Sequence, residues 1–239
     1  MKSTFLRNFS QTARLEPRAQ RQILDVFMTL ASTVASSMAG LYTAERLLFL
    51  EDYQILFSIA LFLLTVGIYA TPSTPGSLSR RRVMLWSVGW ITGALLQPAI
   101  EPLVLYGHEG TVFMALGTVV SLFASFAVAV MATDREQVAY VVGACLYAAM
   151  ALSWVGLVGW FFPTHALTQL TLLLGLLFPC ISMVVHMRHM LDRARVGARI
   201  DPVEYSLGFF SDLVRMFVYL LKFFVNNDKQ QQKKRQKRR

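Results

Sequence analysis

Six long runs of apolar residues, each bounded by charged residues, proline or glycine, dominate the pattern along the chain. Each run is on the order of 20 residues, which is the length that a helix needs to cross a bilayer core of roughly 30 Å. The runs cover residues 23–42, 53–70, 83–103, 112–132, 138–161 and 167–187. The pattern therefore predicts six membrane-spanning helices.

A seventh apolar stretch, residues 203–225, differs from the others because Asp212 and Arg215 lie near its middle. An ionised Asp that faces lipid at mid-membrane costs about 2.5 to 3.5 kcal/mol on insertion scales. We therefore expect this helix to face protein or water, with Asp212 inside the bundle. The two charged side chains are three residues apart and can pair on one helix face. Asp212 either belongs to an ion or proton path or forms a permanent ion pair that pins the last helix.

Composition agrees with a membrane protein, because 55% of the 239 residues are hydrophobic and only 15% are charged. The formal net charge of +9 comes from Lys and Arg in the flanks and short connections, so it does not indicate nucleic acid. We predict a basic cytosolic segment (1–22), a transmembrane domain (23–225) and a basic, disordered tail (226–239) that is attracted to anionic lipid headgroups. Cys145 and Cys180 lie inside apolar runs and are interpreted as packing residues.

Lys and Arg collect in alternate connections, which predicts the orientation of the helices. The N-terminus, residues 80–82 and residues 188–199 are basic and are predicted to be cytosolic, whereas the connections between them are acidic or nearly uncharged. A seventh full span would place the basic tail on the opposite side, against this rule. The last segment is therefore either re-entrant or a central helix that is enclosed by the other six.

Small residues on the first predicted helix favour a helix-contact face, since small side chains let two helices approach closely. These residues are Ser32, Ser36, Ser37, Ala39 and Gly40. On the third predicted helix, Gly93 and Pro98 are expected to loosen the backbone just before Glu101. That acidic end is either a cation entrance or an ordinary helix terminus.

Three possible metal ligands are spaced three residues apart near the end of the sixth apolar run, as in some zinc sites. They are His186, His189 and Asp192. The third residue is rotated away from the first two on a helix, and Arg188 and Arg193 would repel a divalent cation. The chain also offers no credible nucleophile. We therefore expect neither an enzyme nor a bound metal.

Three segments together carry a family resemblance. Residues 70–72 read A-T-P, residues 92–101 read T-G-A-L-L-Q-P-A-I-E and residues 201–217 read D-P-V-E-Y-S-L-G-F-F-S-D-L-V-R-M-F. The last two are similar to the patterns T-G-x-x-L-x-P-A-x-E and D-x-x-x-H-x-x-x-L-F-x-D-x-x-x-x-F of the Bax-inhibitor family, also called the transmembrane Bax inhibitor motif or Lifeguard family. The chain most resembles the endoplasmic-reticulum subgroup, although Tyr205 stands where relatives usually have His.

The resemblance implies an all-α integral membrane fold, a seven-helix bundle with the C-terminal helix in the centre. It implies a multi-pass protein of the endoplasmic-reticulum membrane that acts as a pH-sensitive calcium leak, lowers luminal calcium and restrains cell death. Calcium is then the transported ion, and no cofactor is expected. The alternative is a non-conducting membrane adaptor that binds Bcl-2-family proteins or stress sensors of the endoplasmic reticulum. The sequence leaves oligomer formation open.

The resemblance also assigns Asp212 to one half of the family's paired-aspartate gate. In relatives the partner lies in an F-D-T-Q motif at the end of the sixth helix, where this chain reads V-H-M-R, so His186 replaces the acidic partner. Two close carboxylates share a proton, which makes such a gate respond to acid. A protonated His186 would instead pair with Asp212 and close the gap. The substitution predicts a leak that acid reduces or leaves unchanged.

The predicted ion path thus has Asp212 at its centre, His186 as its modulator and Arg215 beside them on the last helix. Glu101 is expected to contribute at the far mouth. Asp201 lies beside the cytosolic mouth, where it is either an exit site or a solvated loop carboxylate.

Overall fold

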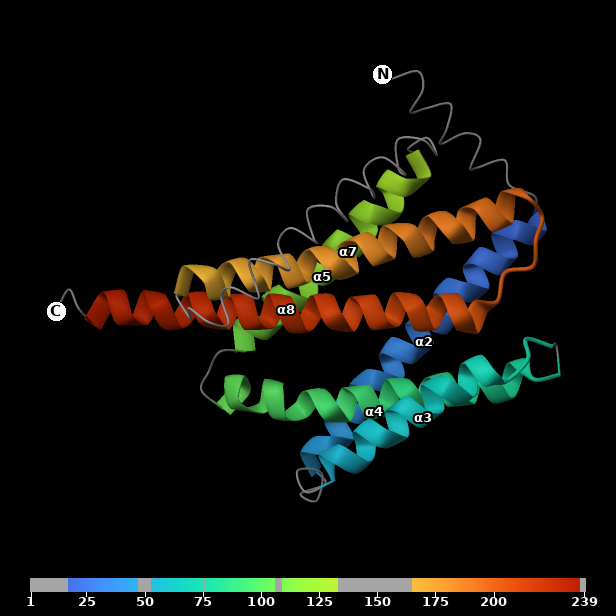
Figure 1. The fold of residues 1–239 in the computed structure, drawn as a ribbon. Helices are drawn as coiled ribbons and strands as arrows, with labels where there is room; N and C mark the ends of the chain where they lie inside the picture. Colours follow the sequence, from blue (N-terminus) through green and yellow to red (C-terminus); the bar gives the residue numbers. More distant parts are fainter. Residues whose placement is uncertain (1–16, 47–52, 75, 106–108, 133–164, 237–239) are drawn as a thin grey trace. The chain divides into compact units, whose positions relative to one another are not determined.

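The computed structural model describes residues 17–46, 53–74, 76–105, 109–132 and 165–236, and every regular element in this part of the chain is an α-helix. The helices, coloured from blue to red in Figure 1, are α2 (Pro17–Arg46), α3 (Gln54–Ala70), α4 (Leu78–Leu105), α5 (Glu109–Ala132), α7 (His165–Arg195) and α8 (Pro202–Gln236). The all-helical fold class is confirmed for these residues. The predicted span at residues 138–161 lies outside them, so the count of seven spanning helices stays a prediction.

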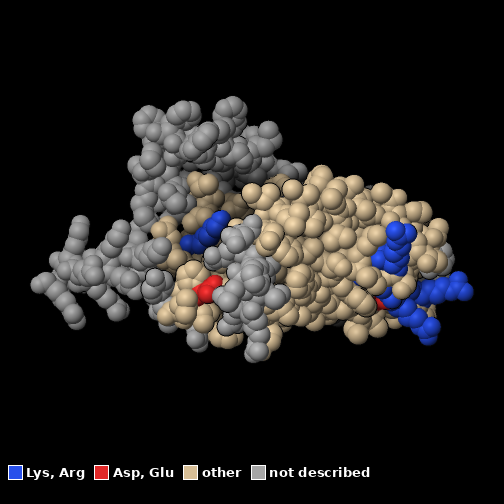
Figure 2. Space-filling view, turned by 90° about the horizontal axis from the view of Figure 1, so that it is seen from below, with Lys and Arg blue, Asp and Glu red and all other residues tan. Residues whose placement is uncertain are grey.

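Three of the described helices contain stretches that are long and apolar enough to cross a membrane, namely Pro17–Ala44, Leu78–Leu105 and Gly110–Val128. Helix α3 is apolar but shorter, with 17 residues, or about 26 Å at the usual helical rise. Its large side chains, such as Ile55 and Phe62, are exposed. Figure 2 shows a broad stretch of described surface without charged side chains, with Lys and Arg at its margins. These features identify a membrane protein.

Helix α8 extends well beyond its predicted apolar segment. It reaches Gln236, so most of the segment 226–239 that we expected to be disordered is helical. The physical reason is that Lys, Gln and Arg are strong helix formers, and extending an existing helix avoids the unfavourable nucleation step. The polar composition of the tail did not predict its backbone conformation.

Helix α4 continues through the region that was expected to be loosened. Pro98 and Pro102 both lie inside it, and the helix ends only at Leu105. A proline removes one backbone donor, but neighbouring groups in a membrane helix can satisfy the carbonyl that is left. The acidic Glu101 therefore lies within a continuous helix and not at a break.

The described residues fall into two compact units, which we treat separately. One unit contains α2, α3, α4 and residues 190–210, which include the end of α7 and the start of α8. The other contains α5, the part of α7 up to His189 and the part of α8 from Ser211 onward. We call them the α2–α4 unit and the α5 unit.

Glycines allow close approach of α2 and α4 in the α2–α4 unit. A Cβ atom on Gly89 would lie 2.6 Å from the carbonyl oxygen of Thr33 on α2. A Cβ on Gly93 would overlap the backbone of Ser37, and one on Gly40 would overlap that of α4. The glycine that we expected to loosen α4 thus permits a tight helix crossing, as small residues do in membrane proteins.

The predicted contact face on α2 is confirmed for most of its members. The Ser36 hydroxyl donates a hydrogen bond of 2.8 Å to the carbonyl oxygen of Trp86. The Trp86 indole N–H in turn donates to the Ser32 hydroxyl at 2.9 Å. Ala39 is exposed and does not belong to the face. Hydrogen bonds and the close approach allowed by small side chains therefore both hold α2 against α4.

We expect Gly93→Ala to lower the thermal stability of the purified protein in detergent. The added methyl group must push α2 and α4 apart, and overpacking of this kind typically costs about 1 to 3 kcal/mol. Gly117→Ala on α5 is the matched control, because a Cβ there meets nothing within 4 Å. Circular dichroism melting curves measure both variants. Equal melting temperatures for the Gly93 variant and the parent would contradict the crossing described above.

The starts of α2, α4 and α8 lie together at one end of the α2–α4 unit. Arg82 pairs with Asp25 at 2.6 Å, which joins the start of α4 to α2. The Ser206 hydroxyl on α8 donates a hydrogen bond of 2.8 Å to the carbonyl oxygen of Val26. These helix starts contain or follow the basic residues that were all predicted to be cytosolic.

Candidate functional site

A buried carboxylate and an imidazole meet between α7 and α8 of the α5 unit. The Nδ1 atom of His186 lies 3.0 Å from Oδ2 of Asp212, within hydrogen-bonding distance. The Asp212 side chain is 2% exposed and that of His186 is 40% exposed. A buried carboxylate is costly unless it has a partner. The structure therefore supplies Asp212 with a titratable partner that remains accessible from one side.

Packing farther along α7 and α8 fixes the relative position of this pair. The two helices run beside each other (Figure 1), and Tyr219 of α8 lies against Gly175 of α7, where any larger side chain would overlap the phenol ring. Closer to the pair, the guanidinium carbon of Arg215 lies 6.0 Å from the centre of the Phe178 ring. These contacts hold α8 so that Asp212 points toward α7.

Arg215 does not pair with Asp212, which was one of the two alternatives for the last helix. Asp212 is buried and turned toward His186, whereas Arg215 is exposed and lies over the Phe178 ring. A spacing of three residues permits pairing on a helix but does not enforce it. The stronger contact available to the carboxylate is the imidazole on the neighbouring helix.

Asp201 is neither a solvated loop carboxylate nor an open ion site. It forms an ion pair with Arg81 at the start of α4, and the two side chains are 11% and 4% exposed. The other carboxylate oxygen, Oδ1, accepts a hydrogen bond of 3.1 Å from the Val203 backbone N–H and so caps the start of α8. The Nε atom of Arg81 donates to the carbonyl oxygen of Ile68 at 3.3 Å. Asp201 thus joins the α7–α8 connection to α3 and α4.

Arg81 is the residue that the sequence analysis missed. It stands between two other arginines and was interpreted only as a topology signal, yet it is 3% exposed. The sequence did contain a signal for this burial. Three consecutive residues of a helix point in different directions, so one of three adjacent arginines on a packed helix is expected to face the protein interior. Its carboxylate partner lies too far along the sequence to be found by spacing.

Glu101 is exposed on α4 and hydrogen-bonded to the side-chain amide of Gln97, one turn earlier. It belongs to the α2–α4 unit, as Asp201 does, whereas Asp212, His186 and Arg215 belong to the α5 unit. Of the five predicted site residues, the structure therefore joins Asp212 and His186 directly.

The paired imidazole and carboxylate are suited to proton exchange rather than to tight metal binding. Calcium takes six to eight oxygen ligands, and this pair offers only one carboxylate. In the part of the chain that the structure describes, no group of three or more His, Cys, Asp or Glu side chains could hold a metal ion.

Known proteins resemble this chain along most of its length. Residues 19–229 match the family described as inhibitor of apoptosis-promoting Bax1. The chain is 26% identical to Bax inhibitor 1 of Arabidopsis thaliana, with 93% of this chain and 86% of the relative aligned. It is 24% identical to Bax inhibitor 1 of Rattus norvegicus and 22% identical to that of Homo sapiens, with 92% of this chain and 91% of the relative aligned in each case. The chain is therefore a divergent member of the Bax-inhibitor family.

Proposed function

We propose that this protein is a calcium leak channel of the endoplasmic-reticulum membrane that lowers luminal calcium and restrains apoptotic cell death. The proposal includes seven membrane helices with the last one central, so that Asp212 lines the ion path. Family membership over most of the chain supports the role in cell death. The observation that carries the channel is the buried Asp212 carboxylate, which pairs with a titratable group and not with a permanent cation.

Burying the charge of a carboxylate within a membrane is unfavourable, so such a residue is expected either to form a stabilising ion pair or to serve a function. A permanent pair with arginine would give a structural reason for Asp212 to be retained. The pair with His186 is different, since a neutral imidazole leaves the negative charge of Asp212 uncompensated and able to attract a cation. Protonation of His186 converts the same contact into a charge-assisted hydrogen bond. We infer that the pair is the gate and that acid closes it.

The alternative function is a non-conducting adaptor that binds Bcl-2-family proteins or stress sensors of the endoplasmic reticulum. Both functions are compatible with a membrane protein of this family, but only the channel gives the buried carboxylate a role in the movement of ions. Calcium flux through the purified protein separates them.

We expect Asp212→Asn to reduce calcium efflux from protein-containing liposomes at pH 7.5 by roughly fivefold, because loss of about 1 kcal/mol of attraction for a cation changes a rate by that factor. Efflux is followed with a calcium-sensitive dye outside the vesicles. Asp25→Asn makes the same chemical change in the half-exposed pair with Arg82 of the α2–α4 unit and should leave the efflux near that of the parent. Parent protein that releases no more calcium than empty liposomes would favour the adaptor.

A further inference from the structure

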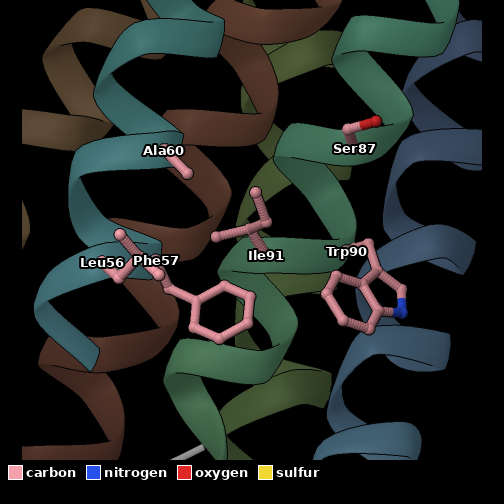
Figure 3. A pocket seen from close by; sticks show the side chains of 6 residues that line it. All are labelled: Leu56, Phe57, Ala60, Ser87, Trp90 and Ile91. Atoms are coloured by element: carbon pink, nitrogen blue, oxygen red, sulfur yellow. The ribbon is translucent and has the colours of Figure 1, made fainter. Parts of the chain in front are cut away.

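An apolar groove lies between α3 and α4 of the α2–α4 unit. Its volume is about 270 Å³, and Figure 3 shows the side chains around it. The lining residues are Leu56, Phe57, Ala60, Ser87, Trp90 and Ile91. The walls are hydrocarbon and aromatic apart from one hydroxyl group, so the groove suits a flexible alkyl chain and not an ion.

A positive charge lies on the same face of α4 as the groove. Arg80, Ser87 and Ile91 share one face of α4, because residues seven and eleven apart fall near the same direction on a helix. Arg80 is exposed, and the helical rise places it about 10 to 17 Å along the axis from the groove residues of α4. This distance matches the separation between a phosphate group and the middle of an acyl chain.

Contacts join α3 and α4 at both ends of this stretch. The Phe57 and Trp90 rings, with centres 6.2 Å apart, join the helices at the groove. Near the other end, Arg81 donates a hydrogen bond to the carbonyl oxygen of Ile68. The exposed Tyr69 follows immediately on α3. Aromatic residues of this kind favour the headgroup level of a membrane.

Arg80 is the arginine at this helix start that can bind an outside anion. Arg81 is engaged with Asp201, and Arg82 is engaged with Asp25. A basic side chain near a membrane surface contributes about 1 kcal/mol to the binding of anionic lipid. The positive charge of Arg80 and the apolar groove thus follow each other along α4, as the headgroup and the acyl chain do in a phospholipid.

We propose that the α3–α4 seam binds an anionic phospholipid, with the phosphate at Arg80 and one acyl chain in the groove. Exposed apolar side chains on α3, such as Ile59, Phe62 and Leu63, are suited to contact with lipid. Zwitterionic phospholipids offer the same acyl chain but no net negative charge, so the seam selects anionic lipid by its arginine. The proposal does not depend on calcium conduction.

Trp90 provides a reporter inside the groove. The chain has four tryptophans, and replacing Trp86, Trp154 and Trp160 by Phe leaves Trp90 alone. In nanodiscs, phosphatidylserine with brominated acyl chains should quench Trp90 fluorescence at roughly fivefold lower mole fraction than brominated phosphatidylcholine, which corresponds to the about 1 kcal/mol given by one arginine. Native mass spectrometry of the parent protein with the same two lipids gives an independent measure of the preference.

The variant Arg80→Gln should remove the preference for phosphatidylserine while leaving quenching by phosphatidylcholine unchanged. Arg195→Gln is the matched control, because it removes an exposed arginine from α7 and should retain the preference. Ala60→Leu should fill the groove and weaken quenching by both lipids. Equal binding of the two lipids by the parent protein, or a preference that survives Arg80→Gln, would overturn the proposal.

Discussion

Replacing His186 by Asp should reverse the response of the calcium leak to acid. In the proposed gate, a protonated imidazole pairs with Asp212 across the 3.0 Å contact. Hydrogen bonds to charged groups contribute about 1.5 to 3 kcal/mol, and the lower value already shifts a closed-to-open ratio by about tenfold. Because His186 is 40% exposed, we expect an effect at the lower end. The leak should therefore fall about tenfold as the pH is lowered from 8 to 5.5.

The His186→Asp variant puts two carboxylates in the same place. They repel each other when both are ionised, and they share a proton as the pH falls. By the resemblance to the paired-aspartate gate, acid should then increase the leak. Calcium efflux from liposomes across this pH range measures both proteins. His189→Asp, an equal change on the exposed side of α7, should keep the direction of the parent. A parent leak that rises in acid and is unaffected by His186→Asp would refute the proposed gate.

Replacing Arg81 by Leu should destabilise the protein more than any other single change to a basic residue at this helix start. The substitution leaves Asp201 without its ion-pair partner at a site where both side chains are nearly buried. Removing one member of a buried pair typically costs about 3 to 5 kcal/mol, since the remaining charge is no longer compensated. It also removes the donor to the carbonyl oxygen of Ile68.

Arg82→Leu is the control next to it in the sequence. Its pair with Asp25 is 32% and 44% exposed, and pairs open to solvent contribute about 0 to 1 kcal/mol. Melting temperatures in detergent should therefore fall strongly for Arg81→Leu and little for Arg82→Leu. The double variant Arg81→Leu with Asp201→Asn should lose less than the sum of the two single changes, because the residues are coupled. Equal losses for the two arginine variants would show that the buried pair has no special role.

The helices themselves were predictable because each depends on a local property of the sequence. Runs of apolar residues set the positions of α2, α4 and α5, and small residues on α2 correctly indicated the side that meets α4. The ends of the helices were less predictable. Pro98 suggested a break that does not occur, and the polar tail suggested disorder where α8 continues. In both regions the backbone follows an established helix in spite of local composition.

The pairing of His186 with Asp212 was accessible from the sequence only through the family pattern. The spacing of charged residues on α8 by itself made Arg215 an equally good partner for Asp212. Asp201 shows the opposite limit, because its role as a cap with a buried partner depends on Arg81, which lies in a different helix. No periodicity in either segment predicts that contact.

The order of residues along the chain was enough to identify a helical membrane protein, the charged residues within its apolar segments and the family to which it belongs. These properties follow from residue type and local order, which hydropathy and motif patterns record directly. The tertiary structure decided which charge meets which: Asp212 with His186, and Asp201 with Arg81. Such pairs depend on side-chain direction and burial, and these are fixed only when the helices pack.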